Sequence, residues 1–223
     1  MIVARRKPLA EIEAVVQDCT QVLVVGCGSC MAVCQAGGEK EVEILARQLR
    51  MRARLASRCQ IVDEITLPRQ CDPEFLRPLA ALVDRYQALV SMACGAGVQL
   101  LAEQFAHRPV FPALDTLFLG VNEGPGTWGQ RCLACGQCIL HLTAGICPKT
   151  LCAKGLLNGP CGGTKHGKCE VNAEKTCAWA AIYNRLEKWG RLELIGRIWP
   201  PADWSVVDTP ARHGTSLAEE SAP

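Results

Sequence analysis

Cysteines dominate the second half of this 223-residue chain, and they constrain its structure more than any other feature. Eight of the fifteen cysteines fall in one segment. The first three have CxxCxxC spacing, which can place three thiolates on three corners of one cubane while a more distant cysteine supplies the fourth. Eight thiolates are the ligand count of two [4Fe–4S] clusters, so the segment is predicted to bind two clusters. The predicted ligands are Cys132, Cys135, Cys138, Cys147, Cys152, Cys161, Cys169 and Cys177.

Two other interpretations of these cysteines are open. Structural zinc also takes four thiolates per ion and would account for the same residues. Disulfide bonds would need an oxidising compartment, but no apolar stretch follows the basic start Arg5-Arg6-Lys7, so no secretory signal is predicted. The expected compartment is therefore a reducing cytoplasm, where abundant cysteines indicate metal or redox chemistry.

Composition argues against several other classes of function. The 24 basic and 22 acidic residues nearly balance, so the chain has no electrostatic footprint for nucleic acid. No apolar run is long enough for membrane insertion. The four histidines form no recognisable Cys–His or Ser–His arrangement, and the acidic residues show no pairing suited to acid–base catalysis. No catalytic residue is predicted, and the expected chemistry is one-electron transfer.

Residues 20–120 alternate predicted strands with predicted helices. Apolar, β-branched runs predict buried strands, and apolar residues at helical spacing predict helices between them. With short connections, this order predicts an α/β fold with a parallel, doubly wound (Rossmann-like) sheet. The strands are expected over 22–25, 60–67, 88–93 and 110–111, and the helices over 9–19, 39–56, 72–83 and 98–105.

Three parts are predicted along the chain. Residues 1–125 form the Rossmann-like domain with a metal or cluster site, and the glycine-rich stretch 120–129 is expected to connect it to the next. Residues 126–199 form a small, loop-rich iron–sulphur domain with a helix over 179–194. Residues 200–223, rich in proline, serine and alanine, are expected to be a mobile tail.

A second group of cysteines lies at the end of the first predicted strand. Cys27 is in the loop, and Cys30 and Cys34 are four residues apart, which puts both thiols on one face of a helical turn. Cys94 follows the third predicted strand, which neighbours the first in a doubly wound sheet, so it is the predicted fourth ligand. This site is expected to hold a third cluster or zinc. The weaker candidates are Cys59 and Cys71.

The same loop also carries part of a dinucleotide-binding motif. Gly26-Cys27-Gly28 is a GxG sequence after a strand, and Asp63 or Glu64 could bind a ribose. However, Met31 occupies the position of the third glycine, so only half of the motif is present. Nucleotide binding is an alternative to metal binding here.

Several motifs together resemble the MetV-like small iron–sulphur subunit of methylenetetrahydrofolate reductase, the methylenetetrahydrofolate reductase C-terminal family. The resemblance extends to about residue 195, and LLNGPCGG at 156–163 is its most specific part. The other matching stretches are VGCGSCMAVC at 25–34, GGEKEV at 37–42, CDPEF at 71–75, ACGAGVQ at 93–99, the CxxCxxC motif, GICP at 145–148, GKCEV at 167–171 and CAW at 177–179.

The resemblance implies a partner, the flavin-containing catalytic subunit that reduces methylenetetrahydrofolate to methyltetrahydrofolate. It also implies a role in one-carbon metabolism, including the acetyl-CoA pathway. The chain would be a non-catalytic subunit that passes electrons between a donor protein and the flavin of its partner. The alternative function is a zinc-binding structural scaffold for a partner enzyme.

Overall fold

The computed structural model describes residues 1–207, and the chain divides into two compact units, Met1–Gln130 and Arg131–Pro223. Residues 208–223, which make up most of the predicted tail, lie outside the described residues. Within residues 1–207, no helix combines the length and the apolar character needed to cross a membrane.

A four-stranded parallel sheet forms the centre of the first unit. Its strand order is β3 (Ile61–Leu67), β2 (Gln21–Cys27), β4 (Ala88–Met92) and β5 (Val110–Pro112). Every residue of β4 is buried, and in β2 only the first residue is exposed, as expected for apolar strands covered on both faces. The predicted α/β class with a parallel sheet is confirmed.

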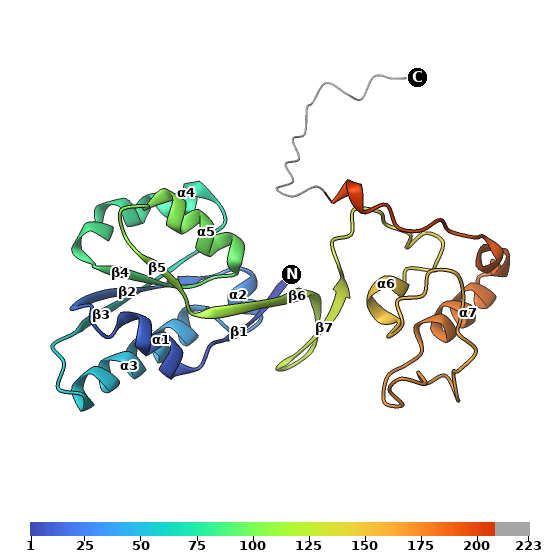
Figure 1. Cartoon of the computed structure of the whole chain (residues 1–223), viewed down its shortest axis with the longest axis horizontal. Helices are drawn as coiled ribbons and strands as arrows, with labels where there is room; N and C mark the ends of the chain where they lie inside the picture. The colour runs from blue at the N-terminus through green and yellow to red at the C-terminus, as the bar shows by residue number, and fades with distance from the viewer. Residues whose placement is uncertain (208–223) are drawn as a thin grey trace, which may run out of the picture. The chain divides into compact units, whose positions relative to one another are not determined.

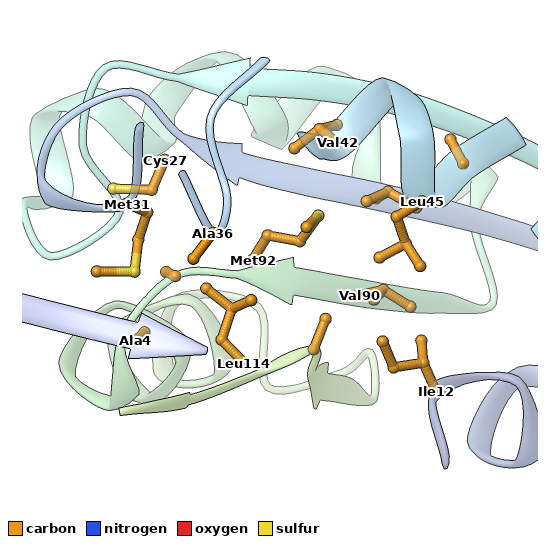
Figure 2. Close-up of a cluster of buried hydrophobic side chains, with 14 of the residues drawn as sticks. Ala4, Ile12, Cys27, Met31, Ala36, Val42, Leu45, Val90, Met92 and Leu114 are labelled. Carbon is orange, nitrogen blue, oxygen red and sulfur yellow. The ribbon is translucent and has the colours of Figure 1, made fainter. Parts of the chain in front are cut away.

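Helices cover both faces of this sheet (Figure 1). Helices α1 (Leu9–Val16) and α3 (Glu39–Leu55) lie on one face, and α4 (Pro73–Leu76) and α5 (Gly95–Gln104) lie on the other. Alternate side chains of β2 therefore enter two separate hydrophobic cores. Val22 and Val24 pack in the core that includes α1 and α3, whereas Leu23 and Val25 pack in the core that includes α4 and α5. Figure 2 shows part of the first core.

The segment predicted as one helix over 72–83 is broken into three short pieces. Asp72 caps α4 as predicted, accepting a hydrogen bond from the Glu74 backbone N–H at 3.2 Å, with Pro73 in the first turn. Pro78 then ends the regular helix, because its ring disfavours helical geometry in the preceding residue and it has no N–H to donate. Two 3₁₀ turns follow, η1 (Arg77–Ala81) and η2 (Val83–Arg85).

A second sheet, absent from the sequence prediction, completes the first unit. It has the order β1 (Ile2–Arg6), β6 (Leu114–Gly124) and β7 (Thr127–Cys132), with β1 and β6 antiparallel. The glycine-rich stretch expected to be a domain connection is thus two strands and the turn between them. Gly126 in that turn has φ of 71°, a conformation that glycine adopts without steric cost.

The second unit has little regular structure. It contains α6 (Pro148–Leu151), α7 (Ala178–Lys188) and the 3₁₀ turns η3 (Leu192–Gly196) and η4 (Trp204–Val206). Its hydrophobic core is small and consists of Ala144, Ile146, Trp179, Ile182, Leu186 and Leu194.

Helix α7 ends earlier than the sequence predicted. Gly190 has φ of 65°, and the Arg191 N–H donates to the Leu186 carbonyl at 2.9 Å, which is the C-terminal closure of a Schellman motif. The helix therefore stops at Lys188 instead of continuing to residue 194.

Candidate metal centres

The carboxyl ends of β2 and β4 bring two cysteines to one edge of the parallel sheet. Gly26 pairs with Met92 in the β2–β4 register, so Cys27 and Cys94 both follow the paired ends of neighbouring strands. The predicted adjacency of these strands is confirmed. Cys27 is only 6% exposed and Cys94 only 7%. The strand order reverses between β2 and β4, and ligands of open parallel sheets bind at such a reversal.

The partial dinucleotide motif has a structural explanation. The backbone N–H of Cys27 donates to the Gly37 carbonyl at 2.9 Å, and that of Gly28 donates to the Leu67 carbonyl at 2.8 Å. These two N–H groups are thus already bonded within the protein, whereas a phosphate-binding loop directs its N–H groups to the ligand. The glycine at position 26 is explained by packing, because a Cβ there would lie 2.6 Å from the Thr66 hydroxyl oxygen.

The two predicted ribose-binding acids are also engaged inside the protein. The Asp63 carboxylate accepts a hydrogen bond from the Tyr86 hydroxyl at 2.8 Å, and Glu64 forms an ion pair with Arg50. These contacts argue against Asp63 and Glu64 as ribose ligands, and the choice between metal and nucleotide at this loop stays a prediction.

Cys34 is buried in the same hydrophobic core as Cys27 and Cys94. It is 3% exposed, and its thiol donates to the Met31 carbonyl at 3.6 Å. Burial raises the pKa of the Cys34 thiol, the nearby backbone N–H groups of Ala4 and Ala36 partly offset this effect, and the neighbouring Cys30 thiol raises the pKa further. Cys34 also lines a pocket of about 500 Å³ together with Ala4 and Trp128 from the second sheet.

Cys71 lies beside Cys27 and Cys94, a neighbourhood that the sequence analysis did not predict. The residue as a whole is exposed, but its thiol is partly covered. Burial raises the pKa of the Cys71 thiol, and the neighbouring Cys94 and Cys27 thiols raise it further. A signal was present in the sequence: β3 ends at Leu67, opposite Cys27, so the residues that follow β3 start at the same sheet edge.

In the second unit, helix α6 begins directly after Cys147, and its residue Lys149 contacts the CxxCxxC loop. Cys147 caps the helix and accepts a hydrogen bond at its sulphur from the Thr150 hydroxyl at 3.4 Å. The Lys149 ammonium donates to the Cys135 sulphur at 3.4 Å and to the Gln137 carbonyl at 3.3 Å. Burial raises the pKa of the Cys135 thiol, but the Gln137 N–H and the Lys149 ammonium outweigh it and lower the pKa overall.

The remaining cysteines of this unit have a different set of neighbours. The backbone N–H groups of Val171 and Asn172 lower the pKa of the Cys169 thiol, and the N–H of Ala153, which follows Cys152, contributes in the same direction. Glu170, next to Cys169, pairs with Lys154 and accepts a hydrogen bond from the Cys161 thiol at 3.4 Å. Cys152, Cys161 and Cys169 therefore share one neighbourhood.

Cys177 lies next to this neighbourhood through backbone pairing. Its N–H donates to the Gly167 carbonyl at 2.8 Å, and the Cys169 N–H donates to the Lys175 carbonyl at 2.9 Å. The two cysteines are thus on paired antiparallel segments, and Cys177 also caps α7.

A comparison with known protein families bears on this second unit. Residues 111–205 match the family model described as methylene-tetrahydrofolate reductase C terminal. The resemblance predicted from the cysteine motifs is thereby confirmed over these residues, which include all eight cysteines from Cys132 to Cys177. Comparisons with curated proteins and with solved structures gave no match.

The match to the methylene-tetrahydrofolate reductase C-terminal family continues beyond residue 195, where the predicted resemblance ended. The structure gives these last residues a contact with the CxxCxxC loop. The Asp203 N–H donates to the Gln137 side-chain oxygen at 3.1 Å, and a Cβ at Gly136 would lie 2.8 Å from a methyl group of Val206. Residues 203–206 therefore pack on this loop, although the sequence assigned them to the tail.

All fifteen cysteines are free thiols. Across residues 1–207, no three histidine, cysteine, aspartate or glutamate side chains are grouped so that they could hold a metal ion. The contacts thus define neighbourhoods of thiols rather than finished coordination geometry. The donor chemistry fits iron–sulphur clusters or zinc, because both are bound by thiolates. The thiolate form is favoured at Cys135 by a backbone N–H group and Lys149, and at Cys169 by backbone N–H groups.

Proposed function

We propose that this chain is an electron-transfer subunit of methylenetetrahydrofolate reductase, with two [4Fe–4S] clusters in its second unit. The observation that carries the proposal is the pair of thiol neighbourhoods, one around Cys135 and helix α6 and one around Cys161 and Cys169, within the region that matches the reductase C-terminal family. One cluster would be held by Cys132, Cys135, Cys138 and Cys147. The other would be held by Cys152, Cys161, Cys169 and Cys177.

When bound, such clusters supply one-electron transfer. The residues of this chain would hold the cysteines as thiolates and set the potential. Lys149 places a positive charge beside the Cys135 sulphur, and backbone N–H groups surround that of Cys169. Hydrogen bonds and positive charge at the sulphurs stabilise the more negative, reduced state, so these contacts are expected to raise the potential of each cluster.

The electron acceptor in this proposal is the flavin of a separate catalytic reductase subunit, and a further protein supplies the electrons. The first unit is proposed to be a Rossmann-like domain. Its parallel sheet, the reversal of strand order between β2 and β4, and the helices on both faces support this proposal. The proposed setting is cytoplasmic one-carbon metabolism.

The test of this function is reconstitution from purified components. Anaerobically purified chain is expected to be brown and to contain at least about eight irons, roughly four per cluster. Alone it should not reduce methylenetetrahydrofolate, and together with the flavin subunit it should support that reduction by a low-potential donor. Folate reduction by the chain alone would overturn the subunit assignment. Fewer than about four irons together with two or more zinc ions would indicate the zinc scaffold instead.

Helix α7 offers a surface for the flavin subunit. Its tryptophans differ: Trp179 is 5% exposed in the core, whereas Trp189 at the helix end is 58% exposed. Tryptophan is enriched among residues that dominate binding energy at interfaces. We expect Trp189→Ala to weaken the complex by about tenfold or more, without changing iron content, in a binding titration.

An exposed tryptophan elsewhere in the unit provides the matched control. Trp204 is 63% exposed and belongs to the segment that packs on the CxxCxxC loop. Trp204→Ala is expected to leave the affinity unchanged. If Trp204→Ala weakens the complex and Trp189→Ala does not, the interface lies near the CxxCxxC loop and the α7 assignment is wrong.

A further inference from the structure

The first unit contains a thiol neighbourhood that the proposed function, centred on the second unit, does not use. It lies where the strand order reverses, at the carboxyl ends of β2 and β4. Cys27 and Cys94 reach this edge from the two paired strands and are almost completely buried. Two buried thiols at the ligand-binding edge of a parallel sheet are well placed to bind a metal, but they need further ligands.

The side chain of Gln70 holds the segment after β3 against this edge. Gln70 is fully buried, and its amide nitrogen donates to the carbonyls of Val25 at 2.8 Å and Gly26 at 2.9 Å. Its amide oxygen accepts a hydrogen bond from the Ser91 hydroxyl at 2.7 Å. The Gln70 side chain is thus hydrogen-bonded to both β2 and β4, and Cys71 is the next residue in the chain.

Both chain neighbours of Cys71 are fixed. Gln70 is held by β2 and β4, and Asp72 on the other side caps α4 through the Glu74 N–H. Helix α5 packs closely on the same segment, since a Cβ at Gly97 would lie 2.9 Å from the Gln70 Cβ. Cys71 is therefore held beside Cys27 and Cys94 by packing and hydrogen bonds, and its partial exposure gives a metal a route to the site.

Cys34 lacks this placement. Its thiol bonds to the Met31 carbonyl, lies near the backbone of Ala4 in the second sheet, and faces a different pocket. To join Cys27 and Cys94 it would have to leave a site in which it is 3% exposed. These contacts favour leaving Cys34 out of the centre, although it shares the first hydrophobic core with Cys27 and Cys94 and its thiol lies near that of Cys30.

We propose that Cys27, Cys71 and Cys94 form a thiolate centre in the first unit, with Cys30 as the fourth ligand and Cys34 outside it. The Cys30 thiol neighbours that of Cys34, and its CxxC spacing to Cys27 would let it complete the centre. The ligand is a thiophilic metal, either the iron of a [4Fe–4S] cluster or a zinc ion, and metal analysis distinguishes the two. The side chains must close around the metal, because no three of them form a metal site in residues 1–207 as they stand.

The test compares single substitutions in the full chain, purified anaerobically and assayed for iron and zinc. Cys71→Ala is expected to lose about four irons, or one zinc ion, relative to the unsubstituted chain. Cys34→Ala should keep the full metal content, as should Cys59→Ala, which removes another exposed cysteine. Cys71→Ser serves as a second variant of nearly the same size, and amide exchange in β2 and β4 shows whether either variant keeps the fold.

Two results would overturn this inference. One is a Cys71→Ala chain, folded as judged by amide exchange, whose metal content equals that of the unsubstituted chain. The other is loss of the centre in Cys34→Ala while Cys71→Ala retains it. Failure of the proposed electron-transfer function would look different, because the roughly eight irons assigned to the second unit would be missing from every chain, the unsubstituted one included.

Discussion

Removal of iron from the purified chain is expected to unfold the second unit while the first unit stays folded. The second unit has a core of only six buried residues, and its regular structure is limited to α6, α7 and short 3₁₀ turns. Domains with so little core depend on metals or cross-links for stability, and metal binding energy then becomes folding energy. The first unit has two larger cores that contain no residue of the second.

Amide exchange measured by mass spectrometry can follow both units in one sample. After chelation under reducing conditions, protection of α7 should fall by on the order of a thousandfold or more, because structural metal sites contribute roughly 10 kcal/mol. Protection of α3 and β2 should change little, and reconstitution with iron and sulphide should restore α7. Unchanged protection of α7 in the iron-free chain would show that the small core is sufficient for folding and would contradict the expectation.

The parallel sheet could be predicted from sequence because its strands carry a local signal. The run Val22–Val25 is apolar throughout, and the strand it predicted lies in the centre of the sheet with both faces covered. The alternation of strands and helices predicts which strands are neighbours in such a sheet. The prediction that Cys27 and Cys94 lie at the ends of neighbouring strands rests on this order.

The second sheet carried no comparable signal. Strand β6 is buried at only two of its eleven positions, Leu114 and Gly120, so its sequence shows neither a continuous apolar run nor strict alternation. Its partner β1 is more than one hundred residues away, and their pairing joins Ile2 to Leu119. Pairing over such a separation depends on tertiary packing, which local patterns do not encode.

The position of Cys71 was missed for a related reason. The end of β3 predicts only the sheet edge at which this segment starts, and the sequence gives no indication that the Gln70 side chain is buried. A glutamine in a loop is usually exposed, so the pattern around Gln70 predicts a solvated turn. Only the contacts with Val25, Gly26 and Ser91 show that this residue places its neighbour at the sheet edge.

These contacts predict a large effect for Gln70→Leu. The leucine fills a similar volume but leaves three buried polar partners without the amide, and a buried group that loses its hydrogen bond costs about 1–3 kcal/mol. We expect the free energy of unfolding of the first unit to fall by roughly 3 kcal/mol, since the carbonyls of Val25 and Gly26 lie within the strand end and are partly satisfied there. Urea unfolding followed through protection of β2 and β4 measures this loss.

Gln99→Leu is the matched control, because that glutamine is exposed on α5 and donates to the Gly95 carbonyl of its own helix. Its effect should stay within about 0.5 kcal/mol. The same Gln70 variant should also lose metal from the first unit, as Cys71→Ala does, because the segment that holds Cys71 loses its attachment to β2 and β4. A Gln70→Leu chain as stable as the Gln99→Leu chain would show that packing alone fixes this segment. A chain that is destabilised but retains its metal would show that Cys71 reaches the centre without the glutamine.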